Sequence, residues 1–203
     1  MLGIRYCGTW TDSSGYGEAN RQDIIALNTV GCDLSTELVV QTQDRVHDDW
    51  MVKRCYSLSE RAIPYNIKII HLTPDCYPRY MEKGKYHIGR LFWETDRLPV
   101  EWIEPINKME EIWTSSETMA QIFRNCGITV PIYAFPQPID ITQADRPWEK
   151  FDLPEHKGFL FYAVLQWIER KNPKALLQAY WETFTGRQDV SLLLKTHRIG
   201  YTQ

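Results

Sequence analysis

The sequence lacks the features that mark several broad classes of protein. It has no run of 18 apolar residues, so we expect no transmembrane helix. Its first residues have no basic leader, apolar core or small-residue cleavage site, so no signal peptide is predicted. The net charge of −3 gives no indication of a nucleic-acid surface. We therefore expect a cytoplasmic protein that binds no nucleic acid, with peripheral contact with a membrane left open.

Cysteine is sparse and follows no metal-binding pattern. The count is odd and no C-x-x-C pair occurs, so neither a zinc site nor a disulfide framework is predicted. Buried or half-buried thiols are the simpler interpretation. There is also no G-x-S-x-G, so no serine-hydrolase nucleophile is predicted. The five cysteines are Cys7, Cys32, Cys55, Cys76 and Cys126.

Short apolar runs alternate with amphipathic stretches over residues 1–140. Helices are expected at 18–28 and 100–109 and after Ser115 or Ser116; strands are expected at 2–10, 38–40, 67–72, 87–95, 111–114 and 130–135. A segment rich in proline and charge, 141–157, predicts a linker, and one strand–helix–strand pattern follows at 158–203. The predicted fold class is α/β: a Rossmann-like parallel sheet, then a partial second Rossmann-like unit.

A glycine-containing loop before the first helix is the clearest local signal. Helix starts present unpaired N–H groups and a positive dipole end, so Gly15, Tyr16 and Gly17 are candidates for binding an anionic group. The dinucleotide fingerprint would require Gly or Ala where Asn20 stands. The alternative is a tight turn that binds nothing.

Polar side chains end two of the predicted strands. His71 ends the strand at 67–72, and Glu94 and Asp96 end the strand at 87–95. Ligands of open parallel sheets bind outside the carboxyl ends of the strands, where these groups can hydrogen-bond hydroxyls or phosphate. His71, Glu94 and Asp96 are therefore the candidate catalytic residues. The alternatives are a capping histidine and a helix-capping cluster before Pro99.

Two cations precede the helix of the second unit. Arg170 and Lys171 stand directly before Asn172 and Pro173, which predict a helix start. Donors, dipole and charge would add there to hold a phosphate. A solvated basic turn is the alternative interpretation.

Taken in order, these segments resemble the retaining, nucleotide-sugar-dependent glycosyltransferases of family 4. The resemblance covers most of the chain and rests on the order and spacing of several motifs, none decisive alone. The motifs are Ser14–Arg21, His71–Pro74, Ile88–Pro99, Glu111–Ser116, Pro136–Asp140 and Phe161–Pro173.

The resemblance implies a GT-B architecture: an acceptor-side lobe (1–140), a linker (141–157) and the start of a donor-binding lobe (158–203). It implies a nucleotide-sugar substrate, a carbohydrate or glycolipid acceptor, and neither cofactor nor metal. The loop at Gly15 and Gly17 would face the donor phosphates, His71 the reacting sugar, and Lys171 and Arg170 the leaving diphosphate. The absence of Asp-x-Asp fits this class better than metal-dependent, single-lobe glycosyltransferases.

Two departures from the family pattern matter. Leu165 and Gln166 occupy the stretch where the family usually has an arginine. The family's paired glutamates, which hold donor sugar and ribose, have no counterpart in this sequence. We therefore expect a fragment that is inactive alone and prone to self-association. Two alternatives remain: an NAD(P)-dependent Rossmann oxidoreductase, and a non-catalytic carbohydrate- or partner-binding module.

Overall fold

The computed structural model describes residues 3–40, 49–143 and 152–197. The chain divides into two compact units, Met1–Asp145 and Arg146–Gln203, which are described separately below. Part of the expected linker, 144–151, lies outside the described residues.

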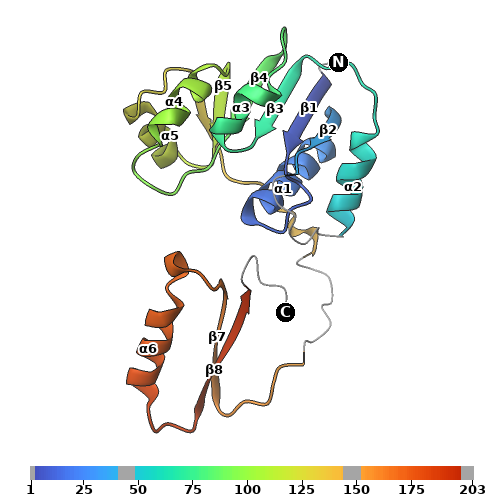
Figure 1. The fold of residues 1–203 in the computed structure, drawn as a ribbon. Coiled ribbons are helices and arrows are strands. Elements are labelled where there is room, and N and C mark those ends of the chain that lie inside the picture. Colours follow the sequence, from blue (N-terminus) through green and yellow to red (C-terminus); the bar gives the residue numbers. More distant parts are fainter. Residues whose placement is uncertain (1–2, 41–48, 144–151, 198–203) are drawn as a thin grey trace. The chain divides into compact units, whose positions relative to one another are not determined.

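The first unit is a six-stranded parallel sheet flanked by helices (Figure 1). Its strand order is β2-β1-β3-β4-β5-β6. The predicted α/β, Rossmann-like fold is thereby confirmed. The elements are β1 (Gly3–Gly8), α1 (Gly15–Thr29), β2 (Asp33–Leu38), α2 (Trp50–Ser59), β3 (Ile67–His71), a 3-10 turn (Pro74–Cys76), α3 (Tyr77–Tyr80), β4 (Tyr86–Arg90), α4 (Val100–Asn107), β5 (Glu111–Thr114), α5 (Glu117–Asn125), β6 (Ile132–Ala134) and a 3-10 turn (Ile141–Gln143).

Two apolar cores cover the two faces of this sheet. Because side chains alternate along a strand, Tyr6 and Cys7 of β1 face opposite sides. Tyr6 packs in one cluster with residues of α1 and α2, such as Ile24 and Cys55. Cys7 belongs to the other cluster, which includes residues of α3, α4 and α5 such as Phe123. Helices α1 and α2 thus cover one face, and α3, α4 and α5 cover the other.

Several element boundaries differ from the sequence-based expectations. The strand expected at 38–40 is β2, which ends at Leu38; Val40 is 70% exposed. The apolar run Leu38–Val40 was a poor guide to the strand because two of the three buried residues of β2 are polar: Ser35 and Thr36 are buried beside Leu34, and Thr36 Oγ1 donates to the carbonyl of Cys55 at 2.7 Å. Helices α2 and α3 were not predicted.

The strand expected at 87–95 is also shorter than predicted. It ends at Arg90, because only the amide of Leu91 continues the pairing, donating to the carbonyl of Trp113 at 3.0 Å. The chain then turns away in a loop, where Trp93 Nε1 and Thr95 Oγ1 both donate to the carbonyl of Arg97.

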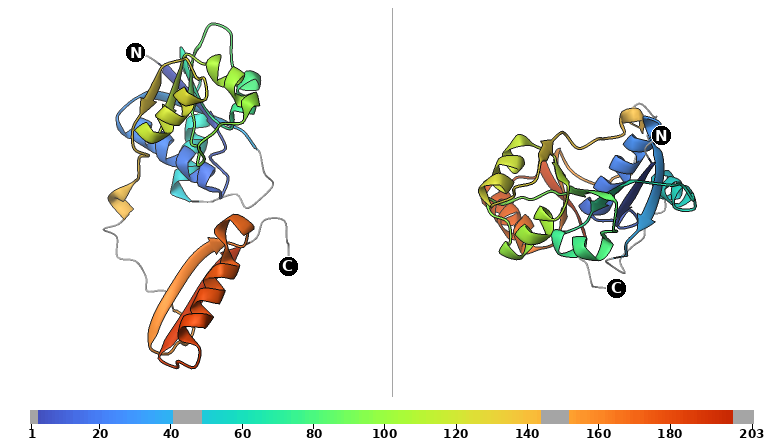
Figure 2. Two further views of the ribbon diagram at one scale, coloured as in Figure 1. Left: turned by 90° about the vertical axis from the view of Figure 1, so that its left-hand side faces the viewer. Right: turned by 90° about the horizontal axis from the view of Figure 1, so that it is seen from above.

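The second unit is one parallel strand–helix–strand motif. Strands β7 (Phe159–Gln166) and β8 (Val190–His197) pair in parallel, and α6 (Pro173–Phe184) lies along one face of them (Figure 2). Phe161 of β7 contacts Tyr180 and Phe184 of α6, with ring centroids 6.4 and 5.2 Å away. The alternate residues Tyr162 and Val164 point to the other face and are 76% and 66% exposed.

Candidate functional site at the carboxyl end of the first sheet

The strand order changes direction beside β1. From β1 the chain passes to β2 on one side, whereas β3 lies on the other side of β1. Open α/β sheets bind ligands outside the strand ends at such a point. Gly8, the last residue of β1, pairs with His71, the last residue of β3. The start of α1 and His71 therefore meet at one edge of the sheet, and this edge is the candidate site.

The expected glycine loop proves to be the first turn of α1. Ser14 is the N-cap, and its side-chain oxygen accepts from the amide of Gly17 at 3.2 Å. A Cβ on Gly17 would lie 2.0 Å from the carbonyl oxygen of Asp12, whereas a Cβ on Gly15 would meet nothing within 4 Å. Gly17 is thus required by the packing of its own turn, with or without a ligand.

A buried arginine fastens the segment between β1 and α1. Arg21 is 1% exposed, and its Nη1 donates to the carbonyls of Trp10 (3.0 Å) and Asp12 (2.8 Å). Its Nη2 lies 2.6 Å from Glu18 Oε2. These contacts fix the backbone that leads into the helix, so the site has a rigid wall on this side.

Asn20 explains why the dinucleotide fingerprint is not matched. Its side chain is fully buried, and Nδ2 donates to the carbonyls of Tyr16 (2.8 Å) and His71 (3.4 Å). The side-chain oxygen occupies the space over Gly8, where an added Cβ would lie 1.6 Å away. The close approach of helix and strand is therefore made by the glycine on the strand, not by one on the helix.

His71 lies at the centre of the site and is fully buried. Its Nδ1 lies 2.5 Å from Tyr6 Oη and 3.4 Å from Asp23 Oδ2. The rings of Tyr16 and Phe92 lie against the imidazole, with centroid distances of 5.3 and 5.2 Å. Within the described residues, Nε2 has no hydrogen-bond partner. Nε2 is therefore a group that a ligand could satisfy, as are Arg90 Nη1 and Asn20 Oδ1, which also lack a hydrogen-bond partner among these residues.

Asp23 joins His71 to the far side of the site. Its Oδ2 accepts from Tyr6 Oη and from Arg90 Nε, each at 3.0 Å. Its Oδ1 accepts from Gln137 Nε2 at 3.1 Å, and Gln137 Oε1 accepts in turn from Arg90 Nη2 at 3.0 Å. The guanidinium of Arg90 lies between the rings of Phe92 and Phe135, 4.6 and 4.7 Å from their centroids. The network thus links α1, β1, β3, β4 and the segment after β6.

The charges of the network follow from burial and pairing. Burial lowers the pKa of His71, and the nearby Asp23 offsets this only in part, so the ring is neutral at pH 7. Burial alone would raise the pKa of Asp23, but the nearby His71, the charge of Arg90 and a hydrogen bond from Tyr6 outweigh it and lower that pKa. Burial and Asp23 raise the pKa of Tyr6 well above its ordinary value. The site therefore holds one carboxylate, one guanidinium and a neutral imidazole.

The sequence pointed to His71 but missed its partners: Tyr6, Asp23, Arg90 and Gln137. A signal was present on α1, because Asn20 and Asp23 stand three residues apart and share a helix face with apolar neighbours. Arg90 stands at a strand end that the over-long strand 87–95 concealed. Gln137 has no sequence signal, since only the folded chain brings it against Asp23.

The structure does not bring Glu94 and Asp96 to a strand end. Both lie in the exposed loop after Arg90, so their expected placement at the sheet edge was wrong. The alternative of a helix cap also fails, because α4 has Pro99 at its N-cap and no side-chain cap bond. Their role as sugar-binding carboxylates remains a prediction.

Arg170 and Lys171 belong to the second unit. They end a 3-10 turn, Glu169–Lys171, directly before α6, and both are exposed. Asn172 adopts a left-handed backbone (φ 47°), and its side-chain oxygen accepts from the amide of Ala175 at 3.3 Å. The predicted helix cap at Asn172 and helix start at Pro173 are confirmed. The two cations thus flank a helix N-terminus.

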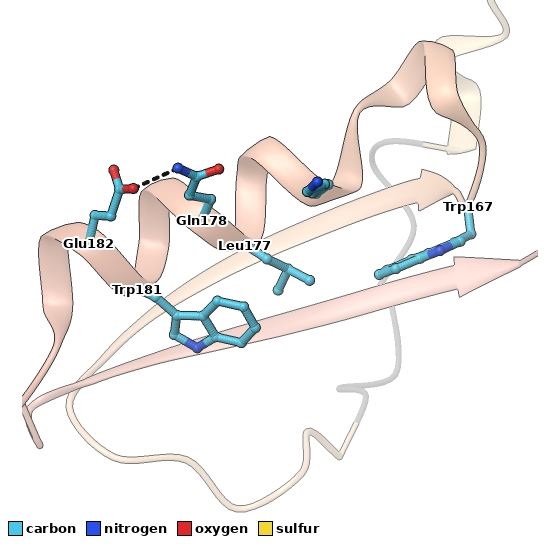
Figure 3. A pocket seen from close by; sticks show the side chains of 6 residues that line it. Trp167, Leu177, Gln178, Trp181 and Glu182 are labelled. Carbon is cyan, nitrogen blue, oxygen red and sulfur yellow. Dashed lines mark hydrogen bonds between the residues drawn. The ribbon is translucent and has the colours of Figure 1, made fainter.

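A pocket of about 360 Å³ lies beside α6 (Figure 3). Leu177 and Trp181 of the helix and Trp167, which follows β7, line it with Gln178, Glu182 and Lys174. Trp181 is 61% exposed, and Gln178 Nε2 donates to Glu182 Oε1 at 2.7 Å. None of the predicted site residues lines this pocket.

No model of a known protein family matches this sequence, and no curated protein matches it significantly. Among the described residues, no cluster of three or more histidine, cysteine or acidic side chains is arranged to hold a metal ion. In the same residues, no helix has the length and apolar character needed to cross a membrane.

Proposed function

We propose that this chain carries the acceptor-side lobe and the first strand–helix–strand motif of the donor-side lobe of a retaining, nucleotide-sugar-dependent glycosyltransferase. The observation that carries the proposal is the position of His71. It lies at the switch point of a Rossmann-like sheet, next to the first turn of α1, and one of its ring nitrogens has no partner in the part of the chain that the structure describes. The order of the family 4-like motifs along the chain supports the same assignment.

The chemistry of such a site is mainly positioning and charge stabilisation. A neutral His71 suits a sugar hydroxyl, because a buried imidazole can make a hydrogen bond without the cost of burying a second positive charge beside Arg90. Lys171 and Arg170, at the start of α6, would stabilise the negative charge that develops on a leaving diphosphate. Glu94 and Asp96 are the carboxylates proposed to hold sugar hydroxyls from the loop after β4.

Calorimetry tests the substrate class. We titrate the chain with UDP-glucose, GDP-mannose and NAD⁺ and expect weak binding of a sugar nucleotide, with a dissociation constant of ~1 mM, or about −4 kcal/mol. Lys171→Ala should weaken it further because a phosphate contact is lost. Lys157→Ala, which removes an exposed lysine of the second unit before β7, is the matched control. Preference for NAD⁺ would favour the oxidoreductase alternative.

Turnover is the second readout of the same proposal. With a panel of sugar nucleotides and acceptors, we expect this 203-residue chain to release no nucleoside diphosphate steadily. The reason is that the paired glutamates expected from the family resemblance have no match in it. Steady release would mean that the donor site is complete within these residues.

A further inference from the structure

Tyr6, Asp23 and His71 of the candidate site can share their protons in only one arrangement of hydrogen bonds. Tyr6 Oη lies 3.0 Å from Asp23 Oδ2 and 2.5 Å from His71 Nδ1, and Nδ1 lies 3.4 Å from the same carboxylate oxygen. A phenol has one proton, an ionised carboxylate has none, and a neutral imidazole has one. The positions of the protons therefore follow from the distances.

The carboxylate needs a proton from each neighbour that it touches. Asp23 accepts from Arg90 Nε at 3.0 Å and from Gln137 Nε2 at 3.1 Å, which keeps it ionised. If Tyr6 donated to His71, its oxygen would face Asp23 Oδ2 at 3.0 Å with no proton between them, a repulsive contact. Tyr6 must therefore donate to Asp23, and its oxygen must accept from Nδ1 of His71.

We infer that Asp23 and Tyr6 are positioning residues that hold His71 in the tautomer with its proton on Nδ1, so that Nε2 is a bare acceptor for a substrate hydroxyl. The hydroxyl assignment rests on the proposed function; the tautomer does not. The hydrogen bond made by one ring nitrogen sets the state of the other. Nε2 is buried and unpartnered within the described residues, as this assignment requires.

The groups that face the imidazole come from every element packed against it. They are Tyr6 of β1, Tyr16 and Asp23 of α1, and Phe92 and the cationic Arg90 of β4 and the loop after it. Asp23 favours and Arg90 disfavours a second proton on the ring. Tyr16 and Phe92 cover the ring with apolar surface, so a hydroxyl would reach Nε2 only if one of these rings shifts.

Long-range ¹H–¹⁵N NMR of the full chain tests the tautomer directly. His71→Asn identifies the His71 signals among those of the five histidines. At pH 7 we expect Nδ1 to show the shift of a protonated nitrogen and Nε2 that of a bare one. A proton on Nε2 alone, or on both nitrogens, would overturn the inference.

Asp23→Asn tests the positioning role. Without the carboxylate, Tyr6 is free to donate to His71, so the Nε2–H form should become the major one. Glu110→Gln is the matched control: Glu110 Oε2 lies 3.2 Å from Nδ1 of His87, another buried histidine, and its loss should leave His71 unchanged. An unchanged His71 tautomer in folded Asp23→Asn would show that Asp23 does not set it.

Tyr6→Phe covers the case in which Asp23→Asn does not fold. It keeps the carboxylate and removes only the oxygen between Nδ1 and Asp23, so the Nδ1 proton signal should move upfield as its short hydrogen bond is lost. An unchanged signal would contradict the relay through Tyr6. These spectra need no donor sugar, so a failed tautomer prediction is distinguishable from a failed glycosyltransferase assignment.

Discussion

At the scale of single residues, Asp23 and Arg90 form a buried ion pair whose disruption is expected to be costly. Arg90 is fully buried and Asp23 is 7% exposed, so neither charge is stabilised by water. Breaking a buried pair by removing one partner leaves the other charge uncompensated. Removing one partner of the pair should therefore destabilise the first unit, whatever the net contribution of the intact pair to its stability.

Arg90→Met tests this directly. It leaves Asp23 buried without its cation, so we expect the first unit to lose about 3–5 kcal/mol of unfolding free energy in urea. Arg124→Met is the control, because Arg124 pairs with Glu117 on the surface of α5, and its loss should cost under about 1 kcal/mol. Equal losses in the two variants would mean that Arg90 is not a buried anchor.

Of the residues that form the network at His71, the sequence alone predicted only His71. His71 was recognisable because it directly ends a run of apolar strand residues, a position fixed by local pattern. Asp23 and Gln137 depend on tertiary contacts between segments 114 residues apart. Local patterns carry no information about such contacts, so only the folded chain could identify them.

At the scale of elements, the start of α1 is the most constrained junction. Ser14 caps the helix, Arg21 holds the preceding carbonyls, and Gly17 lies directly against Asp12. The two glycines of this turn therefore have different reasons to be there. Gly17 is required by packing, whereas no atom lies near the position that a side chain on Gly15 would take.

Alanine substitutions separate these two reasons. Gly17→Ala would place its Cβ 2.0 Å from the carbonyl oxygen of Asp12, so we expect a clear drop in the melting temperature of the first unit. Gly15→Ala meets nothing within 4 Å and should be neutral or stabilising, by up to about 1 kcal/mol, because alanine favours helix. Equal melting temperatures for both variants would contradict the packing requirement.

Alternation of elements was predictable, but their ends were not. Strand β5 and a serine cap at Ser115 or Ser116 follow from sequence because a short apolar run and a capping serine are local signals, and the structure places the cap at Ser116. Helix α2 was not predicted, although it has a buried apolar face made of Met51, Val52, Cys55 and Leu58. Its apolar residues are interrupted by exposed Trp50 and Tyr56, which weaken the contrast between its two faces.

At the scale of the whole molecule, the two units differ in how well they cover their apolar surface. The first has a core on each face of its sheet. The described part of the second has two strands and one helix, and the strand face opposite α6 carries exposed Tyr162 and Val164. Parallel sheets are normally covered on both faces, and two strands alone are marginal.

Self-association should therefore occur through the second unit. We expect the sedimentation coefficient of the chain to rise with concentration, and Tyr162→Lys to reduce that rise by placing a charge on the uncovered face. Tyr133→Lys changes a tyrosine of the first unit that is 53% exposed and serves as the control. A concentration-independent coefficient, or an equal effect of both variants, would contradict this prediction.

The positions of the cysteines give the two units different chemical reactivity. All five lie in the first unit, and Cys7 of β1 and Cys55 of α2 are fully buried. Burial raises the pKa of the Cys55 thiol to about 12 and that of Cys7 further still, so neither is a nucleophile while the sheet and helix stay packed. The rate at which these two thiols are alkylated is therefore set by how often the first unit opens, and the second unit does not affect that rate.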